Sequence, residues 1–166
     1  MKALVYAVLF VVLVPIQSVV MPHLSLWGIK PDLGLVAVSL VGLFAGELEG
    51  LFVGLVLGWI MSLFSADSLL LSMVTKGAVG YVAGLAGRQV AYLTPMALVM
   101  GLLVVSTITG LLMAFVLDLN DHQDVLWALR AVVLPQACFD AVLGGVIYWV
   151  IWSRLTVDRF VSAYRV

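Results

Sequence analysis

Apolar residues dominate the chain, and charged or turn-forming residues divide them into six long runs. We place the runs near residues 3–21, 32–47, 50–66, 68–87, 91–117 and 130–152. A helix needs about 20 residues to cross the hydrocarbon core of a bilayer. The pattern therefore predicts an all-α, polytopic membrane protein with six transmembrane helices, of which the second and third are short for a full crossing.

The two ends of the helical region need separate arguments. The first run also fits a signal peptide, but Lys2 is its only preceding charge and no small-residue cleavage pattern follows, so we interpret it as a spanning helix. Pro22 and Pro31 predict a loop between the first two helices, and Pro135 is expected to kink the sixth.

Composition supports a single membrane domain. Of the 166 residues, 64% are hydrophobic and 10% are charged, whereas soluble domains carry roughly 25% charge. The formal net charge of -1 gives no basic surface for nucleic acid. We therefore predict one transmembrane domain over residues 1–152 and a cytoplasmic amphipathic tail over 153–166.

Lysine and arginine positions predict the orientation. Six helices place both ends of the chain on one side, and these residues concentrate on the cytoplasmic side of a membrane. The side that holds the ends carries Lys2, Arg88, Arg154, Arg159 and Arg165, and the other side carries Lys30 and Arg130. Both termini are therefore predicted to be cytoplasmic.

The tail after Trp152 has an amphipathic pattern. At 100° per residue, one helical face would carry Val157, Phe160, Val161 and Tyr164, and the opposite face would be polar. A helix lying in the headgroup region fits this pattern, and a frayed tail is the alternative.

Glycine recurs at every fourth position from Gly42 to Gly58, in the sequence GLFAGELEGLFVGLVLG. Small residues at this spacing let two membrane helices approach closely. We predict seams formed by Gly50, Gly54 and Gly58 on the third helix, and by Gly77, Gly80 and Gly84 on the fourth. These seams either pack the protein's own helices or bind a partner. In the second case, Gly54→Leu would abolish partner capture and Gly101→Leu would not.

Two glutamates interrupt this series of glycines. Because carboxylates are costly in hydrocarbon, Glu47 and Glu49 are expected in a cytoplasmic turn between the second and third helices. Arg88 is predicted on the same side and is a candidate partner for them. A solvated turn without a particular partner is the alternative.

Two further charges lie within apolar runs. Counting helical rise from the outer ends places Lys76 about 12 Å deep and Asp140 about 15 Å deep. Their opposite signs predict an intramembrane ion pair, with Asp67 as a competing partner for the lysine. The pair would either specify the fold or serve as a coupling-ion or proton site.

Other chemistry is not indicated by the sequence. It contains no nucleophile constellation, phosphate loop or cofactor fingerprint, and the acidic stretch Asp118–Asp124 lacks the glycine and glutamate of a calcium loop. We expect no enzyme, cofactor or metal site. Serines and threonines within the runs are expected to form hydrogen bonds between helices: Ser39, Ser62, Ser72, Thr75, Ser106, Thr107 and Thr109.

The block from Pro31 to Gly84 resembles the rod shape-determining MreD family. The match runs through KPDLGLVAVSLVGLFAGELEG, GLFVGLVLG and TKGAVGYVAGLAG, and the last run, VLPQACFDAVLGGVIYWVIW, is similar to the closing span of that family. Family members often carry an acidic residue shortly after the glycine series, where this chain has Ser62.

The resemblance implies a non-catalytic scaffold in the bacterial inner membrane, supporting cell shape and lateral peptidoglycan synthesis. The implied partner is the bitopic protein MreC, with indirect links to MreB, RodA and a class B penicillin-binding protein. It also implies a fold similar to the S components of energy-coupling factor transporters. A vitamin-binding subunit of that type and, more weakly, a proton-coupled transporter using Lys76 and Asp140 are the alternative functions.

Overall fold

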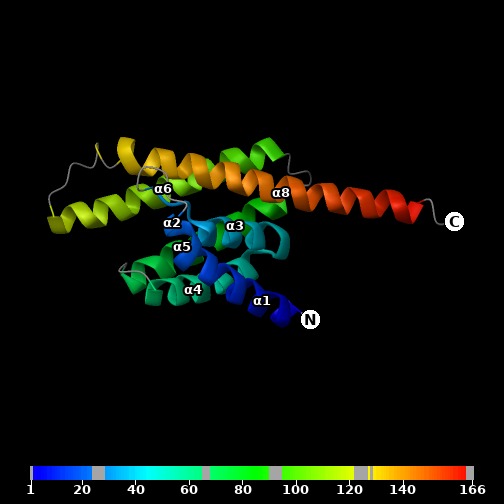
Figure 1. Cartoon of the computed structure of the whole chain (residues 1–166), viewed down its shortest axis with the longest axis horizontal. Helices are drawn as coiled ribbons and strands as arrows, with labels where there is room; N and C mark the ends of the chain where they lie inside the picture. The colour runs from blue at the N-terminus through cyan, green and yellow to red at the C-terminus, as the bar shows by residue number, and fades with distance from the viewer. Residues whose placement is uncertain are drawn as a thin grey trace.

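The computed structural model describes residues 2–23, 29–64, 68–89, 95–121, 127 and 129–163. Its first helical segment comprises α1 (Lys2–Pro15), the π-helical turn η1 (Ile16–Val20) and α2 (Met21–His23). The remaining elements are α3 (Leu33–Ala45), α4 (Glu47–Phe64), α5 (Leu69–Gln89), α6 (Pro95–Asp121), the π-helical turn η2 (Leu129–Val133) and α8 (Leu134–Ala163) (Figure 1). Asp67 and the loop residues around Trp27 lie outside the described residues.

The described part of the chain confirms an all-α protein, and its helices indicate a multi-pass membrane protein. Four segments are long and apolar enough to cross a membrane: Glu47–Phe64, Leu69–Arg88, Met96–Val116 and Leu129–Val150. Two further apolar helices are shorter, at Tyr6–Val20 and Leu33–Ala45. The prediction of six helices therefore agrees with the structure, whereas a full-length span is found for four of them.

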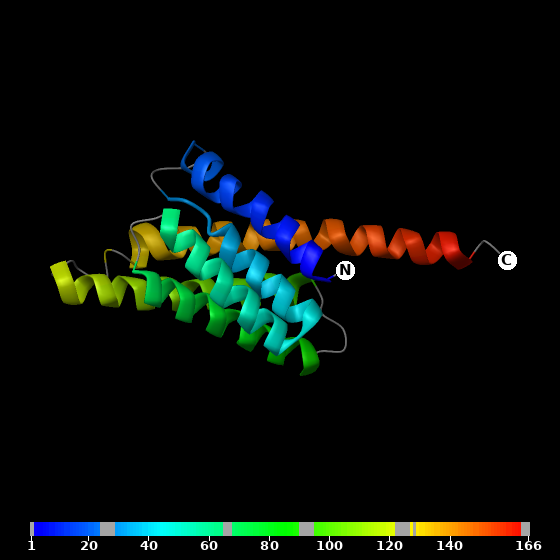
Figure 2. The ribbon, with the colours of Figure 1, turned by 90° about the horizontal axis from the view of Figure 1, so that it is seen from below.

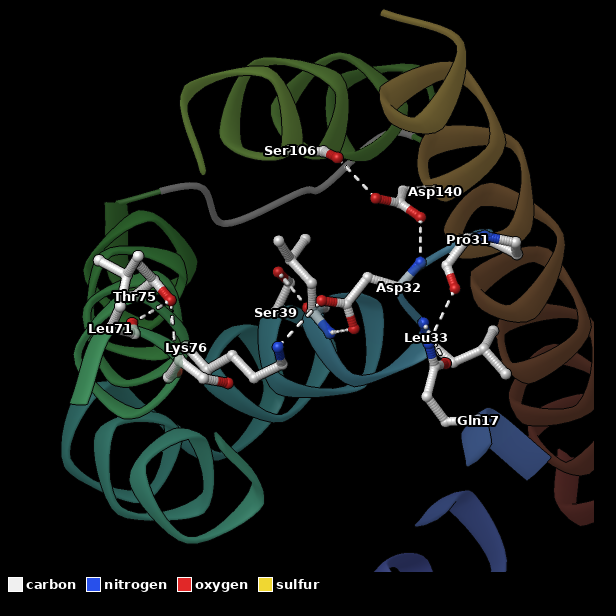
Figure 3. A network of polar contacts seen from close by, with 12 residues as sticks. Gln17, Pro31, Asp32, Leu33, Ser39, Leu71, Thr75, Lys76, Ser106 and Asp140 are labelled. Carbon is white, nitrogen blue, oxygen red and sulfur yellow. Dashed lines mark hydrogen bonds and ion pairs between the residues drawn. The ribbon is translucent and has the colours of Figure 1, made fainter. Parts of the chain in front are cut away.

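Helix α3 lies at the centre of the bundle, with α5, α6 and α8 around its first turns (Figure 3). Its residues Val36 and Val38 are 1% and 0% exposed. One core cluster joins α3 to α5, α6 and α8, and a second joins it to α4 and, through partly buried residues, to α1. With 13 residues, α3 is about 20 Å long, which is less than the roughly 30 Å of bilayer hydrocarbon.

A single residue connects α3 to α4. Gly46 has a φ of 107°, a backbone conformation that glycine adopts without the penalty that a side chain brings. The predicted acidic turn at Glu47 and Glu49 was wrong in its boundary, because both residues belong to the first turn of α4. Acidic side chains are favoured there by the helix dipole, so the turn needs only the glycine before them.

The glycine seams pack α4 against α5 (Figure 2). A Cβ atom built on Gly58 would lie 2.6 Å from the Ser72 carbonyl oxygen, and one on Gly54 would lie 2.7 Å from the Lys76 carbonyl carbon. In return, Gly80 faces the backbone of Gly50. The seam is therefore an internal helix contact, and its alternative use as a partner-binding surface is wrong.

The last helix is continuous beyond the predicted membrane boundary. α8 runs without interruption from Leu134 to Ala163 and projects beyond the rest of the bundle (Figure 1). The tail is thus helical as predicted, but no break separates it at residue 152. Its side chains from residue 154 onward lie outside the described ones, so the amphipathic face stays a prediction. Pro135 lies in the first turn of α8, directly after the π-helical turn η2.

Candidate functional site

The first turn of α3 begins deep inside the bundle, beside residues from the middle of α5, α6 and α8 (Figure 3). The first backbone N–H groups of any helix lack partners within the helix. Inside a membrane no bulk water is present to satisfy them, so side chains must do so. Polar residues from four other parts of the chain supply the required partners.

Asp32 has two roles at this helix start. Its Oδ1 accepts a hydrogen bond from the backbone N–H of Leu35 at 3.0 Å, which makes Asp32 the N-cap of α3. Its Oδ2 lies 3.0 Å from the ammonium Nζ of Lys76 on α5. One carboxylate therefore caps the helix and also fixes it to a neighbouring helix through an ion pair.

Asp140 on α8 approaches the same helix start from the other side and is 0% exposed. Its Oδ1 accepts a hydrogen bond from the backbone N–H of Asp32 at 2.7 Å, and its Oδ2 accepts one from the Ser106 hydroxyl on α6 at 2.5 Å. Each oxygen of this buried carboxylate thus has a donor, as a charge held away from water requires.

Gln17, in the π-helical turn after α1, completes the cap. Its Oε1 accepts a hydrogen bond from the backbone N–H of Leu33, and its Nε2 donates one to the Pro31 carbonyl, each at 3.0 Å. The side-chain amide therefore fastens the first helical segment to the start of α3. We call Gln17, Asp32, Lys76, Ser106 and Asp140 the cap network.

The predicted direct ion pair between Lys76 and Asp140 was wrong. Asp32 lies between them, bonding the lysine through its side chain and Asp140 through its backbone. Depth counting placed the two charges at similar levels, but it did not show that the start of α3 separates their helices. The sequence signal for Asp32 was its place after Pro31 and before an apolar run, a pattern typical of an N-cap.

A second polar group lies at the opposite end of α3, where α4 begins. Arg88 Nη2 on α5 lies 2.7 Å from Glu47 Oε1, which confirms contact between this arginine and one of the two glutamates. The Tyr6 hydroxyl on α1 donates a hydrogen bond to Glu49. The guanidinium side of the pair is open, because the Arg88 side chain is 70% exposed and that of Glu47 is 12% exposed.

Most of the serines and threonines with a described hydrogen bond use it within their own helix. Ser39, Ser62, Thr75 and Thr107 each donate to a carbonyl three or four residues earlier. For these four the predicted contact between helices was wrong. Ser106 is different, since its hydroxyl crosses from α6 to Asp140 on α8.

Three hollows lined by described residues surround the bundle. The largest, about 670 Å³, lies between α1 and α3, and two smaller ones, about 110 and 170 Å³, lie between α5 and α6. Their linings are almost entirely apolar, and no member of the cap network contributes to any of the three. Among the described residues, no group of three or more histidine, cysteine, aspartate or glutamate side chains is placed to hold a metal ion.

Comparison with known proteins gives no family assignment: no protein-family model, curated protein or solved structure matches the chain. The chemistry of the described site is that of a structural cap. Its charges and amides bond to one another and to the first backbone groups of α3, and the hollows lie elsewhere.

Proposed function

We propose that the protein is a non-catalytic membrane scaffold of the bacterial elongation machinery, the role that its resemblance to the MreD family implies. One observation carries the proposal. The intramembrane charges of the described region serve to hold α3 in place, since each bonds to another member of the cap network or to the helix start. A coupling-ion or substrate site would instead leave polar groups facing a cavity.

The proposal includes location and orientation. We place the protein in the bacterial inner membrane with both termini in the cytoplasm, since most lysines and arginines outside the spans belong to that side. In two perpendicular views, the start of α1 and the end of α8 lie toward the same end of the molecule, which fits this topology (Figures 1 and 2). The proposed fold is similar to that of the S components of energy-coupling factor transporters.

The proposed direct partner is MreC, a bitopic protein with one membrane helix, which would link this protein to MreB, RodA and a class B penicillin-binding protein. Outward-facing apolar side chains on α4, α6 and α8 offer surfaces for a partner's helix or for lipid: Phe52, Trp59, Met100, Val104, Val142 and Trp149. Binding between membrane helices depends on packing, so such a scaffold needs no catalytic group.

Co-purification tests this function. The full chain and tagged MreC from the same genome are co-expressed and extracted in mild detergent, with an unrelated bitopic membrane protein as the control bait. We expect the chain to elute with MreC and not with the control. Equal recovery with both baits, or none with MreC, would overturn the proposed function.

A solute-binding subunit is the second candidate, and the 670 Å³ hollow is the observation that favours it, because ligand pockets commonly span about 300–1,000 Å³. Its lining is apolar apart from the Tyr6 hydroxyl, which is bonded to Glu49. A polar vitamin would find few partners there. A thermal-shift screen against vitamins tests this candidate, and strong stabilisation by one of them would favour it over the scaffold.

A further inference from the structure

Helices α5 and α6 follow one another in the chain, yet a cleft separates much of their length. Two hollows lie along this cleft. Ala86, Ala97 and Gly101 contribute to the first, whereas Ala78 and Thr109 contribute to the second. Both are also lined by Val82 on α5 and Val105 on α6. The two valines thus form a partition between hollows that otherwise have small residues in their walls.

The spacing of the hollows matches the repeat of a packed helix. Gly101 lines the first and Ile108 the second, seven residues apart on α6, which corresponds to about 10.5 Å along the axis. Seven residues is the interval at which side chains recur on one face of a helix packed against another. Large side chains at positions i and i+7 of an added helix would therefore meet the two hollows in register.

The outer wall of the cleft is the least covered of the four long spans. Only 11% of the best-scoring window of α6 is buried, against 33% to 44% in the other three. A Cβ atom built on Gly101 would meet no atom within 4 Å. This glycine is therefore not explained by packing within the described part of the protein, in contrast to Gly50, Gly54 and Gly58.

We propose that the cleft between α5 and α6 binds one membrane-spanning helix of a partner protein, which inserts two large apolar side chains seven residues apart. The inference rests on the proposed scaffold function and names the surface that it uses. Small residues in the walls let the backbones approach, and the cleft has no charged lining residue to demand a polar partner. A lipid chain is a continuous cylinder and would fit a continuous groove better than two hollows divided by Val82 and Val105.

Site-specific photo-crosslinking tests the surface in the full chain. A benzophenone amino acid replaces Gly101 in one version and Val142, a 60% exposed residue on α8, in the other. Each version is co-expressed with MreC and irradiated in membranes. We expect an adduct of the partner's mass at Gly101 and none at Val142.

A pair of bulky substitutions gives a second readout. Gly101→Leu should lower the amount of MreC captured by about tenfold, because the side chain enters the cleft that the added helix needs. Val142→Phe, which points away from the bundle, should leave capture unchanged. Both variants should keep the wild-type thermal midpoint, since neither residue faces a tightly packed neighbour.

The outcomes separate this inference from the function on which it rests. If MreC is captured but crosslinks at Val142 and not at Gly101, the surface is wrong and the scaffold function stands. An adduct at Gly101 with lipid alone, or with a second copy of this chain, also overturns the surface. If the wild-type chain captures no MreC, both proposals are overturned.

Discussion

Asp140, in the last long helix, accepts a hydrogen bond from the backbone N–H of Asp32 at 2.7 Å, across 108 positions of sequence. The bond joins a buried carboxylate to the start of a short helix in the centre of the bundle. It explains why the chain keeps an acidic residue inside an apolar span. Without an acceptor at this place, the first backbone groups of α3 would be left without partners in a region that excludes water.

Replacing Asp140 should separate acceptor function from charge. Asp140→Leu removes both acceptors and should lower the free energy of unfolding by about 1–3 kcal/mol or more, the cost of leaving a buried donor unsatisfied. Asp140→Asn keeps an oxygen for the Asp32 N–H and should be less damaging. Thermal or denaturant unfolding in detergent measures the difference, and equal losses in the two variants would contradict a capping role.

The ion pair between Lys76 and Asp32 should be more costly to break than to replace. Lys76→Met leaves the Asp32 carboxylate without its cation, so we expect a loss of about 3 kcal/mol in unfolding free energy. The double variant Lys76→Met/Asp32→Asn removes both charges and keeps an N-cap side chain, so it should recover most of that loss. Strictly additive effects in this double-mutant cycle would show that the pair is not coupled.

Gly54→Leu and Gly101→Leu should differ in the stability of the protein. A side chain at Gly54 collides with the backbone of α5, so overpacking should cost about 3 kcal/mol or more and lower the yield of folded protein. Gly101→Leu extends into open space and should fold normally. Size-exclusion profiles and thermal midpoints of the two purified variants check this contrast. Similar destabilisation of both would argue against the described α4–α5 contact.

Gln17 should control how firmly the first helix is attached. Gln17→Leu keeps the approximate side-chain volume but removes the bonds to the Leu33 N–H and the Pro31 carbonyl. We expect faster proteolysis or hydrogen exchange in α1 and at the start of α3, with α6 and α8 little affected. Ser18, whose hydroxyl bonds to the Val14 carbonyl of its own helix, offers a matched control in Ser18→Ala. Uniform changes along the chain in both variants would contradict the proposed attachment.

The sequence predicted the helices better than it predicted their partners. Long apolar runs are a local property, and the six helical segments fall where those runs lie. The spacing of Gly50, Gly54 and Gly58 indicated a close helix contact, but four-residue spacing carries no information about which helix is in contact. The network depended on Asp32, whose partners on α5 and α8 are distant in sequence. Depth along a helix was readable from residue counts, whereas rotation and neighbour identity were not.

The most direct test measures what the double variant Lys76→Met/Asp32→Asn does in cells that depend on this protein for rod shape. Expression level, MreC capture and cell shape are recorded together. A structural cap predicts a folded variant that captures MreC at the wild-type level and maintains rod shape. A variant that accumulates normally and is folded, yet loses rod shape, would contradict the structural role and indicate that the intramembrane charges act in function directly.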